Sequence, residues 1–308
     1  MNTVFIINPK AGDGKNRVRL ISEIKTLPEK AEIYITKNIG DAEKYVSQYC
    51  KKFGPARFIA CGGDGTLSEV LNGAILCENS EIGVIPIGTG NDFCRNFEKS
   101  VPFSSPLSQT DGDTIKCDAI RYKTTIDGEE KCGYCVNMFN IGFDCNVADL
   151  TSTMKKKPLI SGSLAYLISI FAVLIKKKGA NLKIELDGET FHNGPLLLTS
   201  IANGKYCGGG IKSNPLSSLN DGFINTNIIY NISRLNFLTK LPFYMKGTHI
   251  NLKNIEKVIY SQKCKHIILT PLDGKMRLCI DGEIATAGKT EFEIIHNAFN
   301  FVIPQNRR

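Results

Sequence analysis

Apolar and polar residues in the first 100 positions alternate between two kinds of segment. Short apolar runs, typical of buried strands, are followed by stretches in which apolar residues recur every three or four positions, as on one face of a helix. The predicted strands are Val4–Asn8, Ala31–Thr36, Phe58–Cys61 and Ile82–Ile87. This strand–helix alternation predicts a parallel sheet with helices on both faces, which is a three-layer α/β domain.

The pattern changes near residue 115. From Lys116 onward, most segments are short alternating runs, which are typical of strands that bury one face. Asp-Gly pairs, a strong signal for hairpin turns, separate these runs at 127–128, 187–188, 221–222, 273–274 and 281–282. We therefore expect two domains: an α/β domain at 1–115, and a mainly antiparallel β-sandwich domain at 116–308 with a helical insertion near 145–177.

Three polar loops that contain glycine follow predicted strands of the first domain. They are Asn8–Gly14, Gly62–Thr66 and Gly88–Asp92. Because α/β sheets bind ligands beyond the carboxyl ends of their strands, we expect these loops to form one site. Glycine lets the backbone approach a phosphate, but Asp64 would repel that phosphate unless a divalent cation lay between them. Taken alone, Gly62–Thr66 is also compatible with a tight strand-to-helix turn that needs positive φ.

Other known motifs do not match these loops. A Walker A loop needs glycine where Pro9 stands and serine or threonine where Asn16 stands. A Rossmann dinucleotide loop needs a glycine where Ser68 stands. The four histidines are widely spaced, and no Gly-x-Ser-x-Gly motif of a serine hydrolase is present. A basic face with interleaved aromatic residues is also missing, so we predict no nucleic-acid partner.

Composition and charge narrow the class of protein further. The chain has 308 residues, 42% of them hydrophobic, and a formal net charge of +8, as in an ordinary globular protein with an excess of cations. Its eleven cysteines lack the spacing of a disulfide framework, and Met1-Asn2-Thr3 leads directly into a predicted strand without a signal-peptide pattern. These features favour a reducing, cytoplasmic compartment.

One uncharged segment has a bearing on membranes. Pro158–Ile175 lies between two lysine triplets at 155–157 and 176–178. Its strongly apolar part, Leu164–Ile175, would extend about 18 Å as a helix, which is short of the roughly 30 Å needed to span a bilayer. Two interpretations stay open: a helix lying on anionic lipid headgroups, and a core helix with solvated ends.

Taken together, three segments resemble the motifs of the diacylglycerol kinase catalytic family, which includes bacterial soluble lipid kinases and the sphingosine and ceramide kinases. These segments are Asn8–Gly12, Gly62–Leu67 and Gly88–Phe93. The similarity extends over essentially the whole chain, including Gly208–Gly210 and Leu219–Gly222. The Gly-Gly-Asp-Gly-Thr turn is shared with NAD kinases and phosphofructokinases, whereas Gly88–Phe93 is more specific to lipid kinases. The resemblance implies an α/β nucleotide domain, a β-sandwich domain, and ATP with Mg²⁺ in the cleft between them.

The resemblance also implies roles for individual residues. It implies that Asp64 organises Mg²⁺ at the phosphates, and that a second Mg²⁺ site uses the carboxylate of Asp221 with the backbone carbonyls of Ser218 and Phe223. This chain has Ala11 where the family often has serine, and Asn220 where it often has aspartate. The first change removes a hydroxyl donor, and the second alters the charge of the metal loop. ATP binding is implied for Asn8, Pro9, Lys10, Ala11, Gly12, Thr36, Gly62, Gly63, Asp64, Gly65, Thr66, Leu67, Ser68, Glu69 and Thr89.

Phosphoryl transfer to a lipid hydroxyl also needs a carboxylate that accepts the proton of that hydroxyl. Asp-Gly-Glu occurs three times, at 127–129, 187–189 and 281–283, so the tripeptide alone is compatible with an ordinary hairpin turn. The third copy follows Leu278-Cys279-Ile280, where the resemblance places a catalytic Asp-x-Glu. It implies Glu283 as the proton acceptor and Asp281 as its supporting carboxylate, and we predict that the other two copies are turns.

The sequence thus predicts an ATP- and Mg²⁺-dependent lipid kinase, cytoplasmic and peripheral at the inner membrane surface. We expect contact with an anionic membrane surface, and the default acceptor is diacylglycerol, which gives phosphatidic acid. Sphingoid bases, phosphatidylglycerol and isoprenoid alcohols remain open as acceptors, and NAD is the alternative outside the lipids. A non-catalytic, nucleotide-dependent lipid sensor is the alternative that is not an enzyme. The oligomeric state, with a homodimer included, and the acyl preference are left open.

Overall fold

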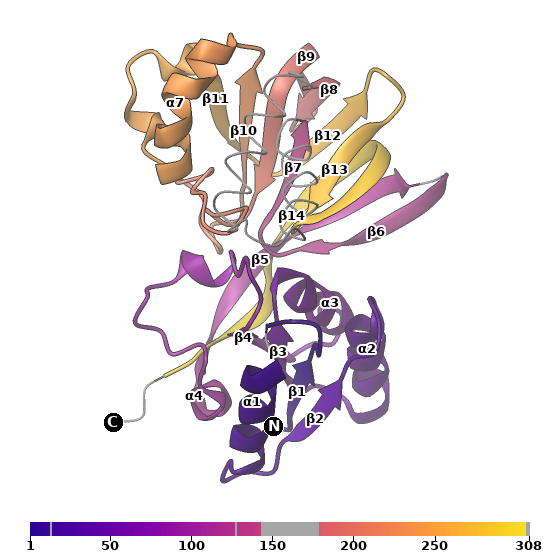
Figure 1. Cartoon of the computed structure of the whole chain (residues 1–308). Helices are drawn as coiled ribbons and strands as arrows, with labels where there is room; N and C mark the ends of the chain where they lie inside the picture. The colour runs from indigo at the N-terminus through magenta and orange to yellow at the C-terminus, as the bar shows by residue number, and fades with distance from the viewer. Residues whose placement is uncertain (13, 127, 143–178, 306–308) are drawn as a thin grey trace. The chain divides into compact units, whose positions relative to one another are not determined.

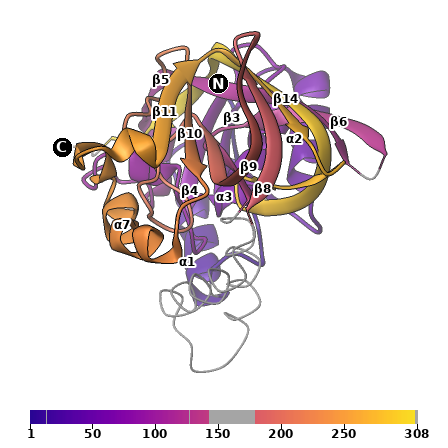
Figure 2. The same ribbon diagram turned by 90° about the horizontal axis from the view of Figure 1, so that it is seen from above.

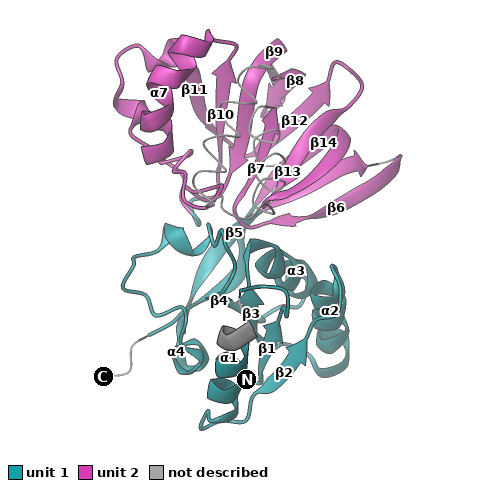
Figure 3. Cartoon of the chain, in the orientation of Figure 1, with its two compact units in different colours: residues 1–119, 219–221, 295–308 teal, residues 120–218, 222–294 magenta. Residues whose placement is uncertain are grey.

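The computed structural model of the chain describes residues 1–12, 14–126, 128–142 and 179–305. The chain packs as two compact units (Figure 3). The first contains residues 1–119, 219–221 and 295–308, and the second contains residues 120–218 and 222–294. The sequence-based domain ranges, 1–115 and 116–308, stay a prediction.

A parallel sheet forms the centre of the first unit (Figure 1). The order of its strands is β14-β4-β3-β1-β2, and each neighbouring pair runs parallel. The inner strands are buried on both faces, which explains why their sequences are almost continuously apolar. The strands are β1 (Thr3–Ile7), β2 (Glu32–Ile35), β3 (Arg57–Gly62), β4 (Glu81–Pro86) and the end of β14 (Glu283–Ile303).

Helices cover both faces of this sheet. Leu20 of α1 packs in one apolar cluster with Phe5 and Ile59. On the opposite face, the ring of Tyr49 in α2 meets Phe58 edge-on, with centroids 5.5 Å apart. Because successive side chains of a strand alternate in direction, Phe58 and Ile59 face opposite layers, and the predicted three-layer α/β domain is confirmed. The helices are α1 (Gly14–Lys25), α2 (Asp41–Phe53), α3 (Asp64–Ala74) and α4 (Pro106–Asp111).

The register of the sheet brings the carboxyl ends of its strands to one level. Ile7 of β1 pairs with both Ile35 of β2 and Cys61 of β3, and Cys61 pairs in turn with Ile85 of β4. The loops that follow these four strands therefore begin side by side at one edge of the sheet.

Antiparallel strands form the second unit, as the alternating sequence pattern predicts. β7, β9, β8, β12, β14 and β13 pair in a closed circuit, and β10 and β11 continue outward from β9. Apolar side chains within the unit, among them Phe139 and Phe292, form one core. The strands are β5 (Asp113–Ile126), β6 (Glu129–Cys135), β7 (Met138–Gly142), β8 (Ala180–Leu186), β9 (Glu189–Ala202), β10 (Ile224–Tyr230), β11 (Ile259–Cys264), β12 (His266–Pro271), β13 (Met276–Ile280) and the first part of β14.

The helix α7 (Arg234–Lys246) covers part of the sheet in the second unit. Its Phe237 and Tyr244 pack with Leu198, Ile229 and Ile259, and it lies beside β10 and β11 in both views (Figures 1 and 2). Two short 3₁₀ turns, η2 (His249–Asn251) and η3 (Ile255–Lys257), lead from α7 to β11.

Within the described residues, no helix is long and apolar enough to cross a membrane. The predicted helical insertion near 145–177, with its apolar part Leu164–Ile175 and the two lysine triplets, lies outside the described residues.

Candidate active site

Asn8 ties the first loop of the candidate site to α3. Its backbone N–H donates to the carbonyl of Cys61 at 3.0 Å, which continues the sheet pairing by one residue. The side-chain Nδ2 donates to Thr66 Oγ1 at 3.1 Å, and Oδ1 accepts from the backbone N–H of Lys10 at 2.9 Å. One carboxamide therefore sets the curvature of the loop and its distance from the first turn of α3.

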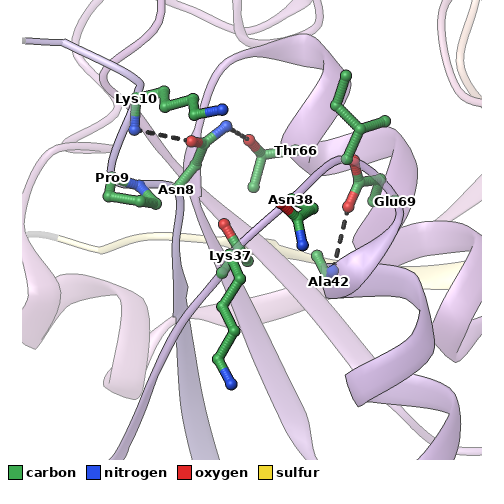
Figure 4. A pocket seen from close by; sticks show the side chains of 10 residues that line it. Asn8, Pro9, Lys10, Lys37, Asn38, Ala42, Thr66 and Glu69 are labelled. Atoms are coloured by element: carbon green, nitrogen blue, oxygen red, sulfur yellow. Dashed lines mark hydrogen bonds between the residues drawn. The ribbon is translucent and has the colours of Figure 1, made fainter.

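A pocket with about 380 Å³ of space between atoms, open to solvent, lies beside this loop (Figure 4). Its wall comes from the loop after β1, the loop after β2 and the first turns of α3. The backbone N–H of Ala42, in the first turn of α2, donates to Glu69 Oε2 of α3 at 3.1 Å and so joins these two helices at the pocket. Among the residues predicted to bind ATP, those that line the pocket are Asn8, Pro9, Lys10, Thr36, Thr66 and Glu69.

Four further lining residues are absent from the sequence prediction. Lys37, Asn38, Ile39 and Ala42 form the rest of the wall. These residues follow the end of β2, just as Lys10 follows the end of β1, and the two strands are parallel neighbours. Their place beyond a strand end was therefore the signal that could have identified them.

Two close approaches in the glycine loops leave no room for a side chain. A Cβ at Gly62 would lie 2.2 Å from Thr66 Oγ1, and a Cβ at Gly88 would lie 2.4 Å from the Cα of Gly63. The backbone N–H groups of Ile87 and Gly88 donate to the carbonyl of Gly62 at 3.0 and 3.2 Å. The loops after β3 and β4 therefore contact each other glycine to glycine, which keeps their backbone accessible to a ligand.

Asp64 begins α3 and lies against the loop after β4. Its Oδ1 accepts from the backbone N–H of Phe93 at 3.3 Å. Burial raises the pKa of the Asp64 carboxyl, and backbone N–H groups of residues 91–93 oppose that shift. The charged form of Asp64 is therefore disfavoured by its surroundings, and a cation next to it would relieve that cost.

A second carboxylate, Asp92, approaches the same place and was missed by the sequence prediction. A Cβ at Gly90 would lie 2.7 Å from Asp64 Oδ2 and 3.6 Å from Asp92 Oδ2, so both carboxylates flank this glycine. Asp92 also forms an ion pair with Arg95 at 3.6 Å. Its signal in the sequence was its place in the same polar loop as Thr89.

The pair Asp64 and Asp92 fits a magnesium ion. Mg²⁺ is usually held by one or two carboxylates, with phosphate oxygens and water completing its octahedron. In the described part of the chain, no cluster of three or more acidic, histidine or cysteine side chains gathers, so no all-protein metal cage is present there. Two carboxylates beside glycine loops are the arrangement expected for a metal that would arrive with a nucleotide.

The other residues predicted to bind ATP occupy different positions. Leu67 is 1% exposed and belongs to the core, so only its backbone is available to a ligand. Gly65 and Ser68 lie in the first turns of α3, and Thr89 is exposed in the loop after β4. Ala11 and Gly12 complete the loop after β1; Gly12 has φ of 68° and a Cβ there would lie 3.0 Å from the carbonyl oxygen of Ile87.

In the second unit, Asp281 and Glu283 belong to the turn between β13 and β14. Asp281 and Gly282 both have positive φ, 44° and 100°, as an Asp-Gly hairpin turn requires. Asp281 Oδ1 accepts from the Met138 N–H at 3.1 Å and from Cys135 Sγ at 3.0 Å, and Oδ2 accepts from the Val136 N–H at 3.3 Å. Asp281 is thus fixed by the segment between β6 and β7, while Glu283 is exposed.

Within the predicted second metal loop, Ser218–Phe223, residues Leu219–Asp221 belong to the first unit. The backbone N–H of Asp118 donates to the Leu219 carbonyl at 2.6 Å. The carboxylate of Asp118 is fully buried, and its Oδ1 accepts from His296 Nδ1 and from the Asn297 N–H, both at 2.8 Å. Asp221 lies two residues beyond Leu219, and the metal site at Ser218, Asp221 and Phe223 stays a prediction.

Comparisons with known proteins agree with this architecture. Residues 2–122 match the model of the diacylglycerol kinase catalytic domain, and residues 137–303 match that of the YegS C-terminal NAD kinase beta sandwich-like domain. The chain is 31% identical to the lipid kinase YegS of Escherichia coli over 230 residues, 73% of each chain. It is 31% identical to a diacylglycerol kinase of Bacillus subtilis over 252 residues, which are 81% of this chain and 78% of the relative.

A solved structure is similar over almost the whole chain. The crystal structure of a proposed diacylglycerol kinase from Bacillus anthracis str. Sterne has a TM-score of 0.74 and 23% identity, and the match covers 98% of this chain and 96% of that one. At this level of identity, the likeness supports the fold.

Proposed function

We propose that this chain, which belongs to the diacylglycerol kinase catalytic domain family and is a lipid kinase, transfers the γ-phosphate of ATP to the hydroxyl of diacylglycerol and so produces phosphatidic acid. The observation that carries the proposal is the convergence of the Asn8 loop, the glycine turn and Asp64 at one edge of the parallel sheet. Diacylglycerol is preferred as acceptor because the Bacillus subtilis relative carries that name over 81% of this chain.

In the proposed complex, the pocket beside Asn8 holds the nucleoside end of ATP. Its wall offers the hydroxyls of Thr36 and Thr66 and the cationic side chains of Lys10 and Lys37. The phosphates then extend toward the glycine turn, where the N-terminus of α3 and the exposed backbone favour negative charge. Residues 8–12, 62–69 and Thr89 are thus proposed as the ATP contacts.

Asp64 and Asp92 are proposed to hold the Mg²⁺ that accompanies ATP. When bound there, the ion would neutralise phosphate charge that the two carboxylates would otherwise repel. The loop with Asp221, Ser218 and Phe223 is proposed as a second Mg²⁺ site, since its residues match the family positions. Asp221 would supply the charge there.

Glu283 is proposed as the general base. The lipid hydroxyl oxygen forms a bond to the γ-phosphorus, the bond from that phosphorus to the β,γ-bridging oxygen breaks, and the hydroxyl proton passes to the Glu283 carboxylate. Asp281 holds the turn that presents Glu283, through its three contacts with residues 135–138. We propose that the enzyme acts as a cytoplasmic, peripheral protein at an anionic membrane surface, where its substrate lies.

The test is transfer of labelled γ-phosphate from ATP to a panel of alcohols: diacylglycerol, a sphingoid base, phosphatidylglycerol, an isoprenoid alcohol, and NAD without lipid or detergent. We expect diacylglycerol to be phosphorylated at least about tenfold faster than the others, the difference that 1.4 kcal/mol of transition-state binding produces. Faster transfer to another lipid would replace the acceptor and leave the lipid kinase in place. Transfer to NAD alone would overturn the choice of acceptor, and nucleotide binding without transfer to any alcohol would favour the lipid sensor.

Asp64→Asn is the matched variant for this assay. We expect it to lower phosphate transfer at least about 10³-fold, because the Mg²⁺ that would neutralise the phosphate charge loses a carboxylate ligand. Burial disfavours the charged carboxyl of Asp64, so the variant without ligands should melt at a higher temperature than the wild type. Added Mg²⁺ with ATP should stabilise the wild type and not the variant. Full transfer by Asp64→Asn would contradict the assigned metal site.

A further inference from the structure

Asn225 and Asn227 lie two positions apart on β10 and are both buried, but their side-chain amides differ in hydrogen bonding. Asn227 is 4% exposed, and its Nδ2 donates to the Ser213 carbonyl at 2.8 Å and to Asn214 Oδ1 at 2.7 Å. Asn225 is 7% exposed, yet its Nδ2 has no hydrogen-bond acceptor. A buried donor without an acceptor destabilises the folded chain, so Asn225 is an unusual residue to find at this position.

Asn225 lines a pocket of the second unit that is separate from the nucleotide pocket. The pocket has about 370 Å³ of space between atoms and lies over β10 and β11, under the segment Asn214–Leu216. Asn225 pairs directly with Lys263 across these antiparallel strands, so their side chains share one face of the sheet. Other polar residues also line the pocket, and Leu216 and Ile250 provide apolar atoms. These polar residues are Asn214, Thr226, Asn227, Ser261 and Gln262.

This lining favours a ligand with negatively charged acceptor oxygens. The Nδ2 group of Asn225 needs an acceptor, and the ammonium group of Lys263, which lies 5.8 Å from the centre of the Phe223 ring, adds positive charge to the same pocket. No aspartate or glutamate is among the residues that line it. A phosphate ester satisfies both donors at once, because its oxygens accept charge-assisted hydrogen bonds from an amide and from an ammonium group.

The segment 231–265, which contributes Ile250, Ser261, Gln262 and Lys263 to this pocket, is basic and includes exposed apolar side chains. Between residues 231 and 265 the sequence has seven lysines and arginines and one acidic residue, Glu256, in a chain whose net charge is +8. Leu235 of α7 is 77% exposed, Phe243 of α7 is 42% exposed, and Leu216 at the pocket is 57% exposed. Cationic side chains beside exposed apolar ones are complementary to an anionic lipid surface, where the lysines meet headgroups and the apolar groups meet acyl chains.

We propose that this pocket binds the phosphate of an anionic phospholipid, and that α7 with the 231–265 segment forms the surface by which the second unit contacts a membrane. The site shares no residue with the pocket beside Asn8, although Lys263 Nζ lies 5.8 Å from the centre of the ring of Phe223 in the proposed second Mg²⁺ loop, and it needs no nucleotide. Its test therefore stands apart from that of the kinase reaction: binding to lipid without ATP can succeed or fail whichever alcohol is the acceptor.

The experiment measures binding of the full chain, without ATP or metal, to vesicles of phosphatidylcholine alone and of phosphatidylcholine with phosphatidic acid. We expect the anionic vesicles to bind at least about tenfold more tightly, since each lysine near an anionic surface adds about 1 kcal/mol. Equal binding to both vesicles would overturn the proposal. Glycerol 3-phosphate in solution separates the two sources of the phosphate group. Saturable binding of glycerol 3-phosphate that does not release the protein from the vesicles would assign the pocket to a free phosphate ester. That result would overturn the proposal that the pocket binds a membrane phospholipid.

Matched substitutions separate the pocket from general surface charge. Asn225→Asp and Asn251→Asp add the same negative charge to the same surface, but Asn251 is exposed and does not line the pocket. We expect Asn225→Asp to weaken binding to anionic vesicles about fivefold more than Asn251→Asp does, because a carboxylate inside the pocket removes a donor and repels the phosphate. Equal losses would show that the pocket takes no part.

A second pair keeps the test decisive if Asn225→Asp fails to fold. Lys263→Gln and Lys253→Gln each remove one exposed charge, and Lys263 alone lines the pocket. We expect Lys253→Gln to weaken vesicle binding about fivefold and Lys263→Gln clearly more, with Lys30→Gln in the first unit as the unchanged control. Equal losses of vesicle binding for Lys253→Gln and Lys263→Gln would contradict a phosphate site at Lys263.

Discussion

Two Asp-Gly-Glu turns of the second unit, 187–189 and 281–283, have the same sequence and nearly the same backbone. In both, the aspartate and the glycine have positive φ: 48° and 91° in the first, 44° and 100° in the second. In both, the aspartate N–H donates to a carbonyl of a neighbouring segment, His266 or Met138. The carboxylates differ. Asp187 accepts from the Lys265 and His266 N–H groups with one oxygen, whereas Asp281 uses both of its oxygens.

This difference shows what local sequence leaves undecided. The tripeptide determines a hairpin turn in both places, because Asp-Gly tolerates the positive φ of both central positions. Whether the turn also holds a glutamate rigidly depends on what surrounds the aspartate. Asp187 lies on an exposed surface, while Asp281 is half-buried and contacts a buried thiol, Cys135, and two backbone amides. A rigidly supported carboxylate is what a general base requires.

Glu283→Gln against Glu189→Gln should separate the two turns most strongly. We expect Glu283→Gln to lower the rate of phosphate transfer about 10²–10³-fold, because the amide cannot accept the hydroxyl proton. ATP binding should be unchanged, since Glu283 does not line the pocket beside Asn8 that is proposed for the nucleotide. Glu189→Gln, an exposed hairpin residue, should keep the wild-type rate. Comparable rates for Glu283→Gln and the wild type would remove the base assignment and leave the kinase family intact.

Asp187→Asn and Asp281→Asn compare a carboxylate that accepts hydrogen bonds with one oxygen, Asp187, with one that accepts with both, Asp281. An asparagine at 187 can keep both hydrogen bonds through Oδ1, so thermal unfolding should show a loss below about 1 kcal/mol. An asparagine at 281 has one side-chain oxygen that can accept, so it can keep the hydrogen bond from the Met138 N–H or the one from the Val136 N–H. In either case its NH₂ group faces the other backbone N–H, which loses its acceptor. We expect a loss of about 1–3 kcal/mol and a lower rate of transfer, with the KM for ATP unchanged. Equal stability losses would mean that the second oxygen of Asp281 contributes nothing.

Gly282→Ala and Gly188→Ala should cost similar stability but differ in activity. A Cβ at either glycine meets no atom within 4 Å, so the cost is that of an alanine at positive φ, about 1–2 kcal/mol. Chemical denaturation of both variants measures it. Only Gly282→Ala should also slow phosphate transfer, because it shifts the neighbouring Glu283. A normal rate for Gly282→Ala would indicate that the position of Glu283 tolerates a distorted turn.

Cys135→Ala gives the smallest expected effect. Burial, followed by the charge of Asp281, raises the pKa of the Cys135 thiol well above its ordinary value, so the thiol stays protonated and donates to Asp281 near neutral pH. Its removal leaves Asp281 with both backbone donors, and we expect about 1 kcal/mol of lost stability with less than about a twofold change in rate. A large loss of activity would identify the thiol as a principal support of the turn.

Much of the fold follows from local patterns. The alternation of strands and helices before residue 100 predicts the parallel sheet, because both periodicities are properties of neighbouring residues. The polar glycine loops after β1, β3 and β4 share one edge because these parallel strands pair in register. The pocket residues Lys37, Asn38, Ile39 and Ala42 were missed because their segment lacks the glycine loop pattern that marked the other strand ends. Asp92 lies in a loop that was expected at the site, but its proximity to Asp64 depends on how the loops after β3 and β4 pack.

By itself, the sequence determined the two kinds of domain, the positions of the glycine loops and the hairpin turns at 187–188 and 281–282, since each depends on residues close together along the chain. The hairpins expected at 273–274 and 221–222 are wrong, because β12 and β13 do not pair with each other and residues 221–222 lie in the long connection between β9 and β10. Only the tertiary structure decided which contacts the loops and turns enter. It brings Asp92 beside Asp64, returns residues 295–305 to the first unit beside the aromatic side chains of residues 93–103, and leaves the amide of Asn225 without an acceptor while Asn227 is satisfied. These outcomes depend on packing between distant segments, where a shift of one residue in register would exchange buried and exposed side chains.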